Sequence, residues 1–218
     1  MELLYQDKRI CVCLKPPGVV STDQPGGMPE LVRSALGTPC VKTVHRLDQV
    51  VGGVMVFARS AAAASILSAQ VRDGRFGKAY LAVVHGAPHS AEGTYTDLLL
   101  RNREERKTYV VGEPGPGVQE AVLDYRVLEQ REGLSLLHVT LRTGRTHQIR
   151  AQFSSRGLPL VGDRKYGNGD DGCDIALWSH RLDFTHPETG EPMTFSALPP
   201  QTWPWTLFEA CAPEENRL

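Results

Sequence analysis

An arginine and an aspartate stand two residues apart at Arg46 and Asp48, shortly before a pair of glycines. If this segment is extended, side chains alternate, so Arg46 and Asp48 share one face while His45 and Leu47 share the other. A carboxylate beside a guanidinium, near glycines that let the backbone approach a ligand, can be a nucleophile with its positioning group. The same pair can also be an ordinary surface ion pair, so the rest of the chain must decide.

Composition excludes several classes of protein. The 218 residues carry a net charge of -1 and suffice for one sizeable domain or two small ones. We expect no membrane association, because no apolar run approaches the roughly 20 residues that span a bilayer. The five cysteines suit no disulfide framework, and Cys11-Val12-Cys13 lacks a second Cys/His pair at zinc spacing. We therefore expect reduced thiols in a cytoplasmic protein without a bound metal.

Charge is unevenly distributed along the chain. Between Arg142 and Lys165 six basic residues face a single acid, Asp163, whereas the tail from Glu188 onward is acidic. A basic region on a nearly neutral protein is compatible with a polyanion bound at one face. The alternative is a solvated charged face, and charge alone favours that alternative.

Periodicity and turn residues predict more strands than helices. Helices are expected over 60–72 after the N-cap Ser60, from near Thr146 to Gly157, and as a short helix around 29–36. Residues 101–118 read as an excursion from the core. The expected strands are 9–14, 53–58, 80–84, 121–128, 134–141, 177–184 and 193–197. This pattern predicts an α+β fold, a mainly antiparallel mixed sheet flanked by a few helices, in a single domain over 1–218.

Five sequence blocks occur in a fixed order, each weak alone and specific together. They are Leu14–Val20, His45–Asp48 with Gly53, Lys78–Tyr80, Arg142–Arg150 and Pro159–Gly167. In this order the chain resembles the RluA-type family of RNA pseudouridine synthases from about residue 7 to about residue 200. The resemblance implies the pseudouridine synthase catalytic fold and isomerisation of uridine in RNA. It also implies no external cofactor, because the reaction oxidises nothing and transfers no group to or from another molecule. It also implies an RNA partner.

The resemblance assigns catalytic roles to Asp48, Tyr80 and Arg150. Asp48 would attack the anomeric carbon or take the proton at C2′, and the sequence does not separate these routes. Arg150 would face Asp48 and hold its carboxylate ionised, unless it is a helix-surface arginine. Tyr80 would stack on the flipped uracil or assist proton removal at C5, unless it is a core tyrosine.

Substrate-binding roles are expected for five further residues. Arg46 would fill the space of the displaced base or hold a neighbouring phosphate. Lys15 would contact phosphate or simply end its strand. His147 and Gln148, like His45, are expected mainly to tie loop backbone together. The complete substrate-binding set is Arg46, Lys15, Arg145, His147 and Gln148.

One departure and one alternative stay open. Where the family usually shows Thr-Ser-Gly, this chain has Val51, Gly52 and Gly53, which leaves the rigidity of Asp48 in question. A catalytically silent RNA-binding protein on the same fold is the alternative. A zinc deaminase is disfavoured, because no Pro-Cys-x-x-Cys follows His186-Pro187-Glu188.

The position of the blocks also bears on RNA recognition. They begin within the first fifteen residues, so we expect no small basic RNA-binding domain before the catalytic one. The RNA-facing surfaces are then expected over 101–109 and 142–165. Ribosomal and transfer RNA are both open as substrates, with a slight preference for ribosomal RNA. We expect a monomer.

Overall fold

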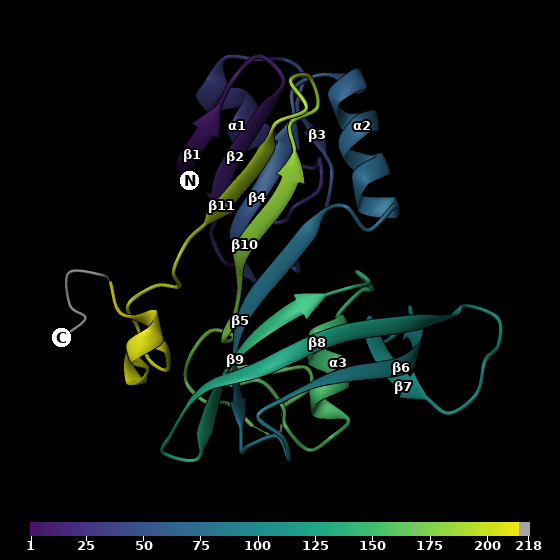
Figure 1. Ribbon diagram of the computed structural model, residues 1–218, viewed down its shortest axis with the longest axis vertical. Helices are drawn as coiled ribbons and strands as arrows, with labels where there is room; N and C mark the ends of the chain where they lie inside the picture. Colours follow the sequence, from purple (N-terminus) through teal and green to yellow (C-terminus); the bar gives the residue numbers. More distant parts are fainter. Residues whose placement is uncertain (168, 214–218) are drawn as a thin grey trace. The chain divides into compact units, whose positions relative to one another are not determined.

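The computed structural model describes residues 1–167 and 169–213 (Figure 1). The chain divides into two compact units. Unit 1 comprises residues 1–78 and 178–197, and unit 2 comprises residues 79–177 and the segment from 198 onward. The expectation of a single domain over the whole chain therefore stays a prediction, and the two units are described one at a time.

Unit 1 is built on strands that are mostly antiparallel. β2 pairs with β1 and β4, β3 pairs with β4, and β11 pairs with β10, all antiparallel, while β4 and β10 run parallel. The strands are β1 (Glu2–Gln6), β2 (Ile10–Lys15), β3 (Lys42–Thr43), β4 (Gly52–Ala58), β10 (Leu177–Thr185) and β11 (Pro192–Ser196). The strands predicted at 9–14, 53–58, 177–184 and 193–197 are confirmed, whereas β1 was not anticipated.

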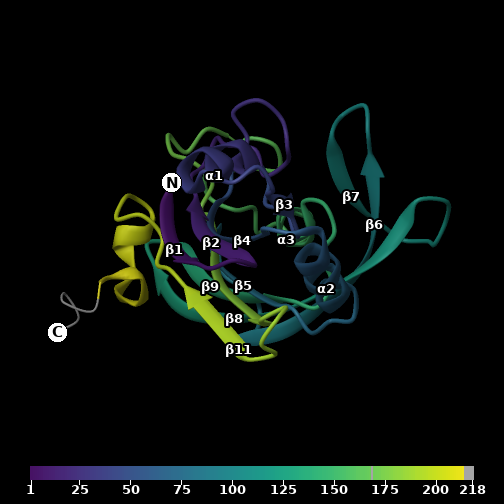
Figure 2. The ribbon, with the colours of Figure 1, turned by 90° about the horizontal axis from the view of Figure 1, so that it is seen from above.

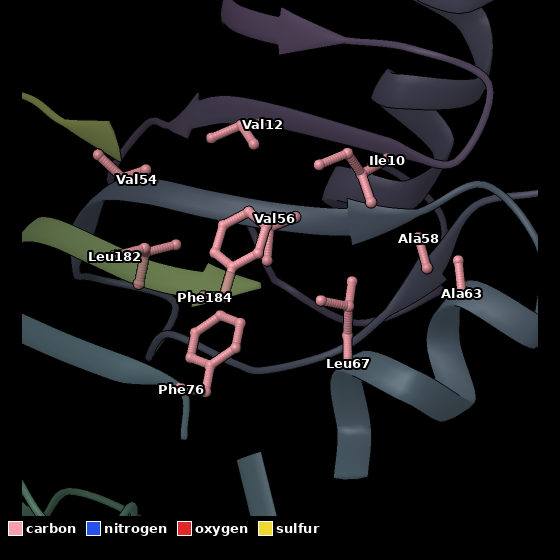
Figure 3. Packing of buried hydrophobic residues seen from close by; sticks show 10 residues of the cluster. All are labelled: Ile10, Val12, Val54, Val56, Ala58, Ala63, Leu67, Phe76, Leu182 and Phe184. Atoms are coloured by element: carbon pink, nitrogen blue, oxygen red, sulfur yellow. The ribbon is translucent and has the colours of Figure 1, made fainter. Parts of the chain in front are cut away.

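The helices of unit 1 are α1 (Met28–Leu36) and α2 (Ala61–Arg72). The predicted cap of α2 is confirmed, because Ser60 accepts a hydrogen bond from the Ala63 amide. Leu67 of α2 packs against strand residues, and Phe76 stacks on Phe184 at 5.4 Å between ring centroids (Figure 3). This apolar cluster fixes the strand β4, which begins directly after the segment that carries Asp48.

Unit 2 contains a fully antiparallel series of strands. β5 pairs with β9, β9 with β8, β8 with β6, and β6 with β7. The strands are β5 (Gly77–His85), β6 (Glu92–Asn102), β7 (Lys107–Val111), β8 (Val118–Arg131) and β9 (Leu134–Leu141), of which β5 begins in unit 1. The predicted β8–β9 hairpin is confirmed. Its connection is shorter than expected, because Glu132 and Gly133 both have positive φ angles and form a two-residue turn.

The excursion predicted over 101–118 is present, and it is built of strands: β6 continues to Asn102 and pairs with β7, and the hairpin that they form projects from β5 and β9 (Figure 2). The start of the last α-helix differs from the expectation by one residue. Helix α3 (Gln148–Ser154) has His147 rather than Thr146 at its N-cap position, and the His147 side chain makes no capping hydrogen bond. His147 adopts a left-handed φ of 55°, which places the start of the helix one residue later than the threonine suggested.

Two short 3-10 helices, η1 (Trp205–Leu207) and η2 (Glu209–Cys211), follow in unit 2. All five cysteines are free thiols. Among the described residues, no helix has both the length and the apolar character needed to cross a membrane. Sheets that are mainly antiparallel, with one parallel pair and a few helices, confirm the predicted α+β fold.

Candidate active site

The segment that carries Asp48 alternates between buried and accessible side chains. His45 and Leu47 are buried, Arg46 is exposed, and Asp48 is half-buried, so the predicted division into two faces is confirmed. The Val51 amide donates to the Asp48 carbonyl at 3.0 Å and closes a turn. Asp48 therefore sits on a turn whose backbone is fixed and whose carboxylate remains accessible.

Lys15 lies beneath this turn. Its side chain is fully buried, and its Nζ donates to the carbonyls of Pro16 at 3.0 Å, Gln49 at 2.9 Å and Val51 at 2.7 Å. An ammonium group has three N–H donors, and each has an acceptor here. Burial lowers the pKa of Lys15 to about 8, and the negative charge of Asp48 opposes that decrease. This geometry suits a group that holds the turn better than one that reaches a phosphate.

The glycines after the turn make room for neighbouring groups. A Cβ on Gly52 would lie 2.5 Å from the ring of Trp178, and one on Gly53 would lie 2.3 Å from the Ser179 carbonyl oxygen. Gly53 also has a φ of +122°, which a side chain would strain. The serine that the family usually has at position 52 would therefore collide with Trp178, whose indole N–H is bound to the Ala197 carbonyl at 3.0 Å. Gly52, which replaces the family's usual serine, therefore leaves the space that the Trp178 ring occupies.

His45 acts in the scaffold. The Val56 amide donates to its Nε2 at 3.2 Å, and its ring packs on Phe76 at 5.4 Å. Burial, together with the nearby charge of Lys78, lowers the pKa of His45 to about 3. The imidazole is therefore neutral near pH 7, and it connects the Asp48 segment to β4.

In unit 2, Arg150 forms a buried ion pair. Its Nε and Nη2 donate to the two carboxylate oxygens of Asp163, both at 2.7 Å, and the side chains are 6% and 0% exposed. Its guanidinium carbon also lies 5.1 Å from the centre of the Tyr166 ring. The alternative of a helix-surface arginine is wrong, because the Arg150 side chain is buried, and the bidentate pairing fixes it in one orientation.

The residues around Arg150 brace its helix. Gln148 is buried, accepts from Thr143 at 2.8 Å and the Arg145 amide at 2.9 Å, and donates to the Val122 carbonyl at 3.1 Å. The Arg145 side chain donates to the Glu120 carbonyl at 2.9 Å. These contacts agree with the expected backbone-tying role of Gln148.

Tyr80 lies on β5 opposite Val139 of β9 and is 6% exposed. Its position in the strand agrees with both interpretations of this tyrosine, since a buried ring can pack in the core and still present its edge to a substrate. Its catalytic role stays a prediction.

Most of the basic side chains between 142 and 165 are neutralised locally. Four of the six arginines and lysines there pair with aspartates: Arg142 with Asp124, Arg150 with Asp163, Arg156 with Asp97, and Arg164 with Asp170. The turn of the β6–β7 hairpin is different. Arg103 and Arg106 are exposed there, and neither forms an ion pair in the described part of the chain.

Asp163 and Tyr166 were not assigned roles from sequence. Asp163 is the lone acid in the basic stretch, and that isolation was a signal that it neutralises a buried cation. Tyr166 had no comparable signal, since its contacts join segments distant in sequence. Among residues 1–167 and 169–213, no cluster of three or more His, Cys, Asp or Glu side chains could hold a metal ion.

Sequence comparison supplies the class of the protein. A family model described as RNA pseudouridylate synthase matches residues 9–155. The chain therefore belongs to the RNA pseudouridylate synthase family, isomerases that act on RNA, and to its RluA-type members.

Individual relatives support this membership. The dual-specificity RNA pseudouridine synthase RluA of Escherichia coli is 36% identical over 212 residues, covering 90% of this chain and 92% of that protein. An uncharacterized RNA pseudouridine synthase of Synechocystis is 33% identical, covering 92% of this chain and 66% of that protein. The chain thus spans about two thirds of the latter's length. The solved structure of human RNA pseudouridylate synthase domain containing 1 has a TM-score of 0.80 and 25% identity, covering 96% of this chain and 86% of that chain.

Proposed function

We propose that this protein converts uridine to pseudouridine in RNA, with Asp48 as the reacting carboxylate. The observation that carries the proposal is a half-buried aspartate on a braced turn, in a chain of the RNA pseudouridylate synthase family. A carboxylate held in place but accessible can meet the sugar without first reorganising its own backbone.

The reaction needs one ionised carboxylate and no outside reagent. Asp48 either forms a bond to C1′ as the glycosidic bond breaks, and is released when C5 attacks C1′, or it removes the C2′ proton and later returns it. In both routes the detached uracil turns, C5 bonds to C1′ and loses its proton, and N1 gains one. In this proposal Arg150 faces the carboxylate with its guanidinium, and Tyr80 supports the uracil ring and assists loss of the C5 proton. The pairing of Arg150 with Asp48 joins residues of different units and stays a prediction.

RNA binding is assigned to exposed basic groups. Arg46 is exposed two residues before Asp48 and is suited to hold the strand from which the target base is displaced. In unit 2 the hairpin turn with Arg103 and Arg106 is favoured over the 142–165 stretch, where most charges are already paired. Affinity is expected to fall as salt rises, because phosphate contacts release counterions.

The substrate is proposed to be a specific uridine in ribosomal or transfer RNA, modified by a cytoplasmic monomer. The E. coli relative is named a dual-specificity enzyme, so both RNA classes belong in the test. The silent RNA-binding alternative is disfavoured, since a protein that only binds RNA gains nothing from a carboxylate facing a polyanion.

Pseudouridine mapping of total RNA from a deletion strain and its parent tests the proposal. Loss of pseudouridine at one or a few positions, restored by the wild-type gene, is the expected result and identifies the substrate. Unchanged maps, together with no activity of the purified protein on ribosomal or transfer RNA, would favour the silent binder.

A further inference from the structure

Tyr166 contacts three separate segments of unit 2. Its hydroxyl accepts a hydrogen bond from the Thr108 amide of β7 at 2.7 Å and lies 2.8 Å from Nδ1 of His147, the cap of α3. Its ring lies 5.0 Å from Nζ of Lys107 and 5.1 Å from the guanidinium carbon of Arg150. One side chain thus joins the β6–β7 hairpin to the helix that carries Arg150.

The directions of these hydrogen bonds follow from their donors. Arg101, which has no acceptor atom in its side chain, lies 3.3 Å from the same His147 Nδ1, so Nδ1 must be the acceptor. The Tyr166 hydroxyl already accepts from Thr108, and it therefore donates its own proton to Nδ1. Burial raises the pKa of Tyr166, which keeps this proton in place near neutral pH.

Two local features show that the contact between Tyr166 and His147 is structurally constrained. His147 has a left-handed φ of 55°, a conformation that costs energy in a residue with a side chain and persists only where its surroundings hold it. The Tyr166 backbone is fixed as well, because its amide donates to Asp163 at 3.1 Å and its carbonyl accepts from Ser154 at 2.9 Å. Tyr166 is therefore attached to Asp163, the partner of Arg150.

We infer that Tyr166 is a positioning residue that couples the basic β6–β7 hairpin to Arg150, so that RNA held by the hairpin is aligned with the catalytic arginine. The hydroxyl fixes the hairpin, and the ring supports the guanidinium. This inference rests on the proposed function for its RNA part, whereas the coupling itself is a property of unit 2 alone.

Two substitutions separate the hydroxyl from the ring. Tyr166→Phe removes both hydroxyl hydrogen bonds and keeps the ring on Arg150, so the KM for RNA should rise about threefold to tenfold, the equivalent of one hydrogen bond, with kcat within about twofold. Tyr166→Leu also removes the ring, and kcat should fall as well. Tyr125→Phe is the matched control, because Tyr125 is buried in the same unit against Tyr95 and Phe153.

Hydrogen exchange of the Thr108 amide tests the coupling without RNA. We expect exchange to be roughly tenfold faster in Tyr166→Phe and unchanged in Tyr125→Phe, since only the former loses the acceptor. Unchanged Thr108 exchange in Tyr166→Phe would overturn the inference, as would a loss of kcat with KM unchanged. If the wild-type protein forms no pseudouridine, the proposed function fails, and the exchange measurement still decides whether Tyr166 couples the hairpin to α3.

Discussion

The two units each bury a cation, and they satisfy it in different ways. In unit 1 the Lys15 ammonium donates to three backbone carbonyls, those of Gln49 and Val51 in the Asp48 turn and that of the neighbouring Pro16. In unit 2 the Arg150 guanidinium is paired with the carboxylate of Asp163. The Lys15 ammonium therefore holds the backbone of a turn, whereas the Asp163 carboxylate holds the side chain of Arg150.

The difference matches what each cation must position. The backbone of the Asp48 turn is held through the carbonyls of Gln49 and Val51, so this ammonium fixes the turn through main-chain atoms. Arg150 is itself proposed to act, and a planar guanidinium needs a bidentate partner to fix its plane. A buried cation that donates to carbonyls therefore holds a loop, whereas one that pairs with a carboxylate is itself held in a single orientation.

Asp163→Asn is expected to have the largest effect on stability. The substitution keeps the shape of the side chain and removes the charge that pairs with the buried guanidinium in two hydrogen bonds, and breaking a buried ion pair costs about 3–5 kcal/mol. Denaturant unfolding measures the loss. Asp124→Asn, in the exposed pair with Arg142, is the control and should cost about 1 kcal/mol or less. Equal losses of unfolding free energy in the two variants would show that the buried Arg150–Asp163 pair contributes no more stability than the exposed Arg142–Asp124 pair.

Lys15→Met should come next, at about 2 kcal/mol or more, because the carbonyls of Pro16 and Val51 lose the ammonium donor and each unsatisfied group costs about 1 kcal/mol or more. The Gln49 carbonyl keeps a hydrogen bond from the Gly18 amide at 2.8 Å. Turnover should also fall, since the Asp48 turn loosens. Lys8→Met, at an exposed position, is the control. A Lys15→Met protein of normal stability that instead loses only RNA affinity would return Lys15 to a phosphate-binding role.

Gly52→Ser tests the packing that follows the Asp48 turn. The new side chain meets the Trp178 ring, and overpacking of this kind costs about 2 kcal/mol. Adding Trp178→Leu should recover part of the loss, as expected for two residues in contact. Gly112→Ser is the control, because a Cβ there meets nothing within 4 Å. Wild-type stability in Gly52→Ser would mean that the glycine does not accommodate Trp178.

His45→Gln gives the smallest effect, visible only in the pH dependence of stability. The folded pKa of about 3 lies below the ordinary value of 6.5, so the unfolded chain binds the proton first as pH falls through that window. Stability contributed by neutral His45 is therefore present above pH 6.5 and is lost toward pH 3. Between pH 7 and pH 5.5 the loss is about 1 kcal/mol.

The glutamine variant should flatten that slope, because its amide can accept from the Val56 amide without titrating. The free energy of unfolding at several pH values gives the comparison, and His89→Gln, at an exposed position, is the control. An unchanged slope in His45→Gln would assign the acid sensitivity of this region to another group.

Much of the fold could be predicted from the sequence, because the signals were local. The Ser60 cap of α2, the β8–β9 hairpin and the alternation from His45 to Asp48 depend on neighbouring residues only. Helix α3 began one residue later than its threonine suggested, since the left-handed His147 is held by Tyr166 from a distant segment.

The contacts that hold the Asp48 turn in place could not be predicted from the sequence. Lys15 was expected to bind phosphate or end its strand, and nothing local reveals that its acceptors are carbonyls 34 and 36 residues further along. The match between Gly52 and Trp178 joins positions on two parallel strands. Such contacts are set by the tertiary fold, so no periodicity or capping pattern records them.

The central claim is that Asp48 is the reacting group. Its most direct test compares pseudouridine formation by purified wild-type protein, Asp48→Asn and the exposed control Asp73→Asn on the RNA identified by mapping. Removal of the carboxylate charge should abolish product formation while RNA affinity and folding stay near wild type, and Asp73→Asn should remain active. Full activity of a correctly folded Asp48→Asn protein would contradict the proposed mechanism.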